Sequence, residues 1–195
     1  MRKFEVEIKR SVGGNDPLPA GGYVAKIMNA EVKEYTWGEV MVISFDVAEG
    51  EYKDFFANQY RANTNEDKKW KGNFRLTVPN EGNQYFDSQK RTFGNALACI
   101  EESNNGYRWD WNEAKLKGKM VGVLFRNFEW EMNGNSGWST EACTLVSVDD
   151  VRSGNFKMPK DKPLKKKESN SVSYVPASYG QPNLQPIDDG DDLPF

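Results

Sequence analysis

The amino-acid sequence predicts a mainly β domain with one α-helix, followed by a disordered tail. From Met1 to Ser153, short stretches of alternating apolar and polar residues are separated by Gly, Pro and Asn. A single stretch carries its apolar residues at helical spacing instead. Beyond Ser153 the sequence is rich in Lys, Pro, Ser, Asn and Gln, a composition that cannot offset the entropy of ordering by burial.

The predicted strands are short and bounded by turn residues. They cover residues 4–8, 23–35, 40–47, 54–61, 119–132 and 138–148. In the third of these stretches, Met41, Ile43, Phe45 and Val47 share one face. The last two stretches flank NGNSG, whose Asn and Gly residues tolerate the positive φ that a tight hairpin needs.

The predicted helix covers about residues 89–102. Ser88 is placed to cap its start, and Phe93, Leu97 and Ile100 form a stripe that we expect to face the core. The Asn-Asn-Gly sequence that follows supplies its end.

About five strands, with one helix between the third strand and the final pair, is the element order of an OB-fold barrel. Such barrels bind oligonucleotides through the face of their second and third strands and the neighbouring loops. Another small β barrel or a β sandwich is the alternative that the sequence leaves open. We divide the chain into an OB-like single-stranded-nucleic-acid-binding domain at residues 1–154, a disordered linker at 155–187 and an acidic tip at 188–195.

The net charge of −3 is divided unevenly along the chain. Residues 168–195 hold five acidic residues and no Lys or Arg, and subtracting them from the 29 acidic residues leaves 24 against 26 basic ones. The rest of the chain therefore has a balance of +2. Any basic patch on the domain has to come from local clustering.

Cys99 and Cys143 are the only cysteines, and the sequence contains no His. This excludes a disulfide framework, a four-Cys or mixed zinc site and the usual Ser-His-Asp and Cys-His mechanisms. We expect no cofactor, no metal and no enzymatic activity. The N-terminal MRKFEVEIKR lacks an apolar run, so we expect no signal peptide, no membrane partner and a location in a reduced cytoplasm.

The sequence ends in IDDGDDLPF, where acidic residues precede a short apolar end. An apolar pocket with a basic rim would bury the ring of Phe195 and hydrogen-bond its carboxylate. An acidic solubilising tail is the alternative, but it does not explain the aromatic residue in the last position. The predicted partner-binding residues are Asp188, Asp189, Asp191, Asp192, Leu193, Pro194 and Phe195.

This tip resembles that of the bacterial single-stranded DNA-binding proteins, in which an Asp-rich stretch precedes Leu or Ile, then Pro and Phe. The matching residues are Asp191, Asp192, Leu193, Pro194 and Phe195. Gly190 interrupts the acidic run. The resemblance implies that the tip binds replication, recombination and repair proteins.

The body of the chain has a different resemblance. PLPAGGYVAKIMNAEVKE and VISFDVAEGEYKD look like a phage-encoded family found among replication and recombination functions. This implies a phage or prophage version of the protein, acting in the host cytoplasm.

Binding of single-stranded DNA without strong sequence preference needs rings on which bases stack and cations along the sugar-phosphate path. Several predicted strands and loops interleave the two, and on residues 119–132 a period of two places a cation and two rings on one face. The predicted DNA-binding residues are Trp37, Phe56, Tyr60, Arg61, Lys69, Trp70, Lys71, Arg75, Arg126, Phe128 and Trp130.

Each of these segments has a second interpretation. The loop KKWKGNFR can be a solvated basic loop with Trp70 tucked over the barrel. The face formed by Arg126, Phe128 and Trp130 can belong to the core, since aromatic residues on strands usually do.

Two other functions compete with DNA binding. Asp46, Glu51 and Lys53 form a carboxylate and Lys set of the kind that holds Mg²⁺ in nucleases, although we favour the simpler explanation that they are charged residues at a turn. Alternatively, the domain is a protein-binding adaptor whose tip imitates that of a DNA-binding protein. Whether the chain forms a homo-oligomer stays open.

Overall fold

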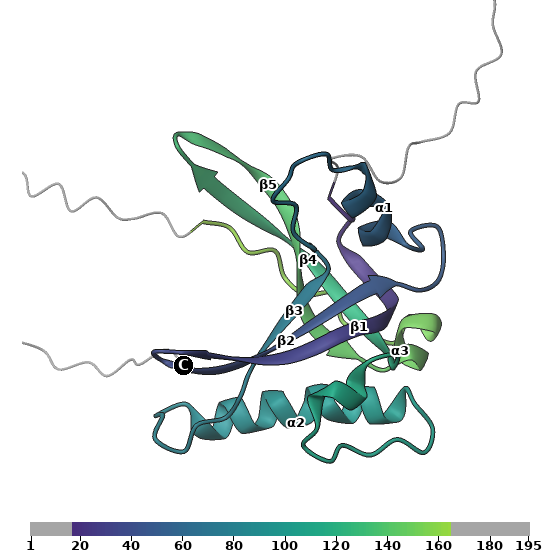
Figure 1. Cartoon of the computed structure of the whole chain (residues 1–195), viewed down its shortest axis with the longest axis vertical. Coiled ribbons are helices and arrows are strands. Elements are labelled where there is room, and N and C mark those ends of the chain that lie inside the picture. The colour runs from purple at the N-terminus through teal and green to yellow at the C-terminus, as the bar shows by residue number, and fades with distance from the viewer. Residues whose placement is uncertain (1–16, 165–195) are drawn as a thin grey trace, which may run out of the picture. The chain divides into compact units, whose positions relative to one another are not determined.

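A computed structural model describes residues 17–164 and shows a mainly β domain (Figure 1). One five-stranded antiparallel sheet has the strand order β3-β2-β1-β4-β5. The strands are β1 (Gly21–Tyr35), β2 (Gly38–Val47), β3 (Asn73–Thr77), β4 (Met120–Met132) and β5 (Asn135–Val146). The helices are α1 (Phe55–Ala62), α2 (Phe86–Glu102) and α3 (Val148–Ser153), with a 3-10 turn at Glu113–Leu116.

This strand order, with α2 between β3 and β4, is that of an OB-fold. The predicted fold class is therefore confirmed, although α1 and α3 add to the single helix expected. All neighbouring strands are antiparallel, so β3 and β5, at the two edges, run in the same direction. The sheet is not hydrogen-bonded between them and leaves a seam there. The strand predicted at residues 4–8 lies outside the described residues.

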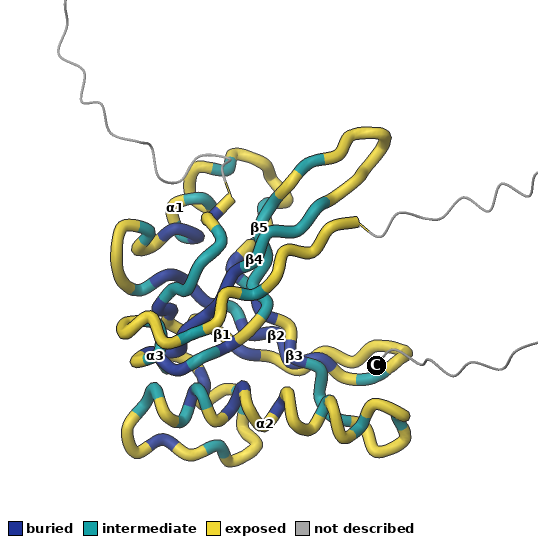
Figure 2. Tube along the Cα trace, turned by 180° about the vertical axis from the view of Figure 1, so that it is seen from behind, coloured by how far each residue is buried: buried dark blue, intermediate teal, exposed yellow. Residues whose placement is uncertain are grey.

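The core lies between the inner face of the sheet and α2. Met41, Ile43, Phe45 and Val47 of β2 are all buried, as their alternation predicts. Phe93, Leu97 and Ile100 of α2 are buried too, as their helical spacing predicts. Figure 2 shows burial concentrated where β1, β2 and β4 meet, whereas the ends of both hairpins are exposed.

Helix α2 begins earlier than predicted and ends where predicted. Its N-cap is Tyr85, so the prediction that Ser88 caps it is wrong. The side chain of Asn104, just past the other end, donates to the carbonyls of Ile100 and Met120 and accepts from the amide of Met120. These bonds fasten the end of α2 to the start of β4.

The segment at residues 54–61 is a helix, α1, and not the predicted strand. Phe56 and Tyr60 are four residues apart, a spacing that places them on one face of a helix as well as of a strand. The third strand is β3 instead, which begins inside the predicted loop KKWKGNFR and continues past it to Thr77. Helix α1 was missed because its cap is a residue of β2, as described below.

The folded unit runs to Leu164, past the boundary predicted at 154. The amide of Lys162 donates to the carbonyl of Asn127, and the amide of Glu129 donates to the carbonyl of Lys162. Residues 155–164 thus cover the edge of β4 beyond its pairing with β1. Within residues 17–164, none of the helices combines the length and apolarity that a membrane crossing requires.

Gly72 allows the loop before β3 to touch β2. Its carbonyl accepts from the amide of Phe45, and a Cβ at Gly72 would overlap the Phe45 carbonyl oxygen and come 2.6 Å from the Phe56 ring. We predict that Gly72→Ala lowers the free energy of unfolding by about 1–3 kcal/mol or more.

Gly94→Ala is the control, because a Cβ there meets open space on α2 and should stabilise the helix by about 0.5–1 kcal/mol. Urea unfolding followed by circular dichroism measures both. A Gly72→Ala protein as stable as the parent would contradict the close packing.

Candidate nucleic-acid interface

A groove of about 660 Å³ lies at the open seam between β3 and β5. Its walls are residues of both strands, the first half of α2 and Leu18. Apolar side chains such as Phe74, Leu76 and Phe125 contribute to its lining. Five of the predicted DNA-binding residues line it: Phe56, Lys71, Arg75, Arg126 and Phe128.

The cations of this groove differ in their partners. Arg126 donates to the Glu141 carboxylate at 2.7 Å, and Lys162 donates to the same oxygen at 3.3 Å. Burial would raise the pKa of Glu141, but these hydrogen bonds outweigh it and lower that pKa. Lys71 and Arg75 are exposed and form no ion pair with any described residue, so they are the cations open to a phosphate.

Arg126, Phe128 and Trp130 do share one face of β4. They stand opposite Glu141, Ser139 and Gly137 of β5 in the strand register. The ring of Trp130 lies against Gly137, and its side chain is 36% exposed. This face is at the surface and continues the groove outward, so the alternative that it belongs to the core does not hold for Trp130.

A second hollow, of about 550 Å³, lies beside α1. It is lined by the predicted residues Tyr60, Arg61 and Trp70 and by two further cations. These are Lys26, which the sequence analysis missed, and Lys53, which it named only as part of a metal-binding set. The predicted Lys69 lines a small recess beside it, together with Tyr60 and Lys71. Lys26 is far in sequence from the aromatic residues, and the pairing of β1 with β2, which places Lys26 opposite Asp46, brings it near them. Lys53 lies in the turn just before α1.

Trp70 and Phe56 are less exposed than a ring that stacks on a base needs to be. The indole Nε1 of Trp70 donates to the carbonyls of Phe45 and Gly72, so Trp70 is tucked over the barrel. Phe56 is only 6% exposed, and its ring centroid lies 5.7 Å from that of Phe45. Phe56 is therefore a core residue whose ring also borders the groove and the small recess.

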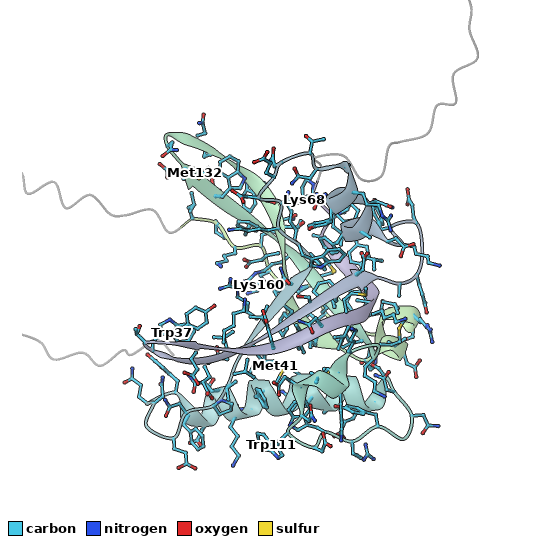
Figure 3. The ribbon with its side chains drawn as sticks, in the orientation of Figure 1. Trp37, Met41, Lys68, Trp111, Met132 and Lys160 are labelled. Carbon is cyan, nitrogen blue, oxygen red and sulfur yellow. The ribbon has the colours of Figure 1, made fainter. Side chains whose placement is uncertain are left out.

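The β1–β2 and β4–β5 hairpins project to the same side of the domain (Figure 1), and their ends are exposed (Figure 2). Trp37, 60% exposed, stacks on Tyr35 with ring centroids 5.3 Å apart. Figure 3 places Trp37 near the end of one hairpin, Met132 at the end of the other, and Trp111 away from both, below α2. Tyr35 was missed, although its spacing of two from Trp37 across the turn could have indicated the pair.

The carboxylate of Asp46 has a structural role. It accepts from the amides of Val47, Phe56 and Ala57, and so caps α1, whose own N-cap residue Asp54 makes no side-chain bond. Burial raises the pKa of Asp46, while the three hydrogen bonds oppose that rise. Within residues 17–164 no group of three or more acidic or Cys side chains is arranged to hold a metal.

Comparison with known proteins adds no assignment: no protein-family model matches the chain, and no curated protein matches its sequence. The predicted tip, at residues 188–195, lies outside the described residues.

We predict that Asp46→Ala destabilises the domain by about 1–3 kcal/mol, because it leaves two buried amides and one partly buried amide without an acceptor. Urea unfolding measures the change. Asp67→Ala is the control, since Asp67 is exposed in the loop before β3, and should change the free energy of unfolding by no more than about 0.5 kcal/mol. Equal effects of the two substitutions would show that Asp46 does not hold α1.

Proposed function

We propose that this protein binds single-stranded DNA without strong sequence preference, in replication, recombination or repair, and recruits partner proteins through its C-terminal tip. One observation carries the proposal: the seam groove brings Lys71 and Arg75, which pair with no described carboxylate, next to rings on the neighbouring hairpin. The groove lies on an OB-like barrel, a fold that binds oligonucleotides.

The chemistry of the surface suits an unpaired strand. Phe128 and Trp130 offer faces on which any base can stack, and each stacked base contributes about 1–3 kcal/mol. Lys71 and Arg75 neutralise phosphates and release counterions, which makes binding depend on salt. Tyr60, Arg61 and Lys53, around the second hollow, extend the same combination past α1.

The cytoplasm is the location that we propose. Cys99 and Cys143 are both free, as in proteins of a reducing compartment.

A salt series with a fluorescent oligo-dT and a matched duplex tests DNA binding. We expect tight binding of the single strand at low salt and much weaker binding of the duplex. The logarithm of the affinity should fall with the logarithm of salt by about 0.7 for each phosphate neutralised. Absent binding, or equal binding of both forms, would leave the protein-binding adaptor as the better explanation.

Trp130→Ala should weaken oligo-dT binding by about 5- to 150-fold, the loss of one stacked base. Trp111→Ala is the matched control, because Trp111 is 77% exposed but lies away from both hairpins (Figure 3). Fluorescence anisotropy measures both affinities. If the two variants bind alike, Trp130 does not stack on DNA.

The tip proposal rests on the residues of IDDGDDLPF and their resemblance to the bacterial tips. Deletion of residues 188–195 should abolish binding of replication and repair proteins and leave oligo-dT affinity equal or higher, because it removes a competing polyanion. Pull-down from a bacterial lysate, with a Phe195→Ala variant beside the deletion, measures the first effect. Partner binding that survives both changes would refute the role of the tip.

A further inference from the structure

The seam between β3 and β5 has the properties of a vacant strand position. Because β3 and β5 run in the same direction, a strand antiparallel to β3 along its free edge would continue the alternation of the sheet. The lining of the groove includes the apolar side chains of Leu18, Phe74, Leu76 and Phe125.

The edge of β3 that faces away from β2 has backbone N–H and C=O groups that are not hydrogen-bonded to β2. The amide of Phe45 donates to Gly72, and the amide of Val78 donates to Glu39. In the register of this pair, the hydrogen bonds to β2 therefore fall on every second residue, Phe74 and Leu76 included. The amides of Arg75 and Thr77 point away from β2, toward the seam.

We infer that the chain's own N-terminal segment, residues 4–8, docks as a strand in this seam. Phe4, Val6 and Ile8 would face the apolar lining, and Glu5 and Glu7 would lie on the side of the exposed Arg75 and Lys71. The segment has five residues, and β3 has five as well.

The chain enters the domain where such a strand would have to connect. Pro17 and Leu18 line the groove, and the carbonyl of Leu18 accepts a hydrogen bond from the Thr140 hydroxyl of β5. Residues 9–16 span at most about 28 Å when extended, and Gly13 and Gly14 lie among them. They are long enough to turn the chain back into the groove beside its point of entry.

Docking of residues 4–8 does not depend on DNA binding, but it has a consequence for it. Lys71 and Arg75 would contact the acidic residues of the docked segment in one state and a phosphate of the DNA in the other. If the proposed function is correct, the segment and a single strand exclude each other from the groove, and Val6→Asp binds oligo-dT several-fold more tightly than Val12→Asp.

Amide hydrogen exchange of the full-length chain tests the docking without DNA. Val6→Asp puts a charge on the apolar face of the segment, and Val12→Asp makes the same change in the connecting residues. We expect the amides of Arg75 and Thr77 to exchange at least about tenfold faster in Val6→Asp than in Val12→Asp.

The amide of Ile27, which donates to the carbonyl of Lys119, should stay equally protected in both variants and so reports that the domain is intact. Equal exchange of Arg75 and Thr77 in the two variants would overturn the docking. If the exchange differs and oligo-dT does not bind, the docking stands and the proposed function fails.

Discussion

The carboxylate of Asp46 fixes helix α1 to the end of β2, and the two candidate binding surfaces both border this helix. From the end of β2 it accepts from two amides in the first turn of α1, a helix whose own N-cap gives no side-chain bond. Helix α1 in turn separates the seam groove from the second hollow, because Phe56 lines the one and Tyr60 the other. A single buried acid thereby sets the spacing of two candidate binding surfaces.

The fold could be predicted from sequence wherever the pattern is local. The period of two on β2 and the helical stripe of α2 both identified buried residues correctly. On β2 the other face is buried too, because Val40, Val42 and Asp46 are also enclosed, and the alternation did not show this. The Asn-Gly pair between β4 and β5 has positive φ at both residues, as a tight hairpin requires. Helix α1 could not be predicted in this way, since its cap comes from residue 46.

The residue types of the candidate site could be predicted from the sequence, but the ion pairs that these residues form could not. The sequence identified Arg126, Phe128 and Trp130 as one face, and the register of β4 with β5 places them so. It could not show that Glu141 forms ion pairs with both Arg126 and Lys162. These residues meet only because β4 pairs with β5 and the chain after α3 comes back to β4. Alternation also cannot distinguish an enclosed ring such as Phe56 from an exposed one such as Trp130.

The backbone bridge between Lys162 and β4 determines where the domain can be cut. Ending the chain at Gly154 would remove Lys162 and leave the amide of Glu129 and the carbonyl of Asn127 without their partners, next to the exposed Trp130. An unpaired strand edge beside an exposed aromatic ring promotes aggregation. An isolated domain that remains monodisperse therefore has to extend to Leu164.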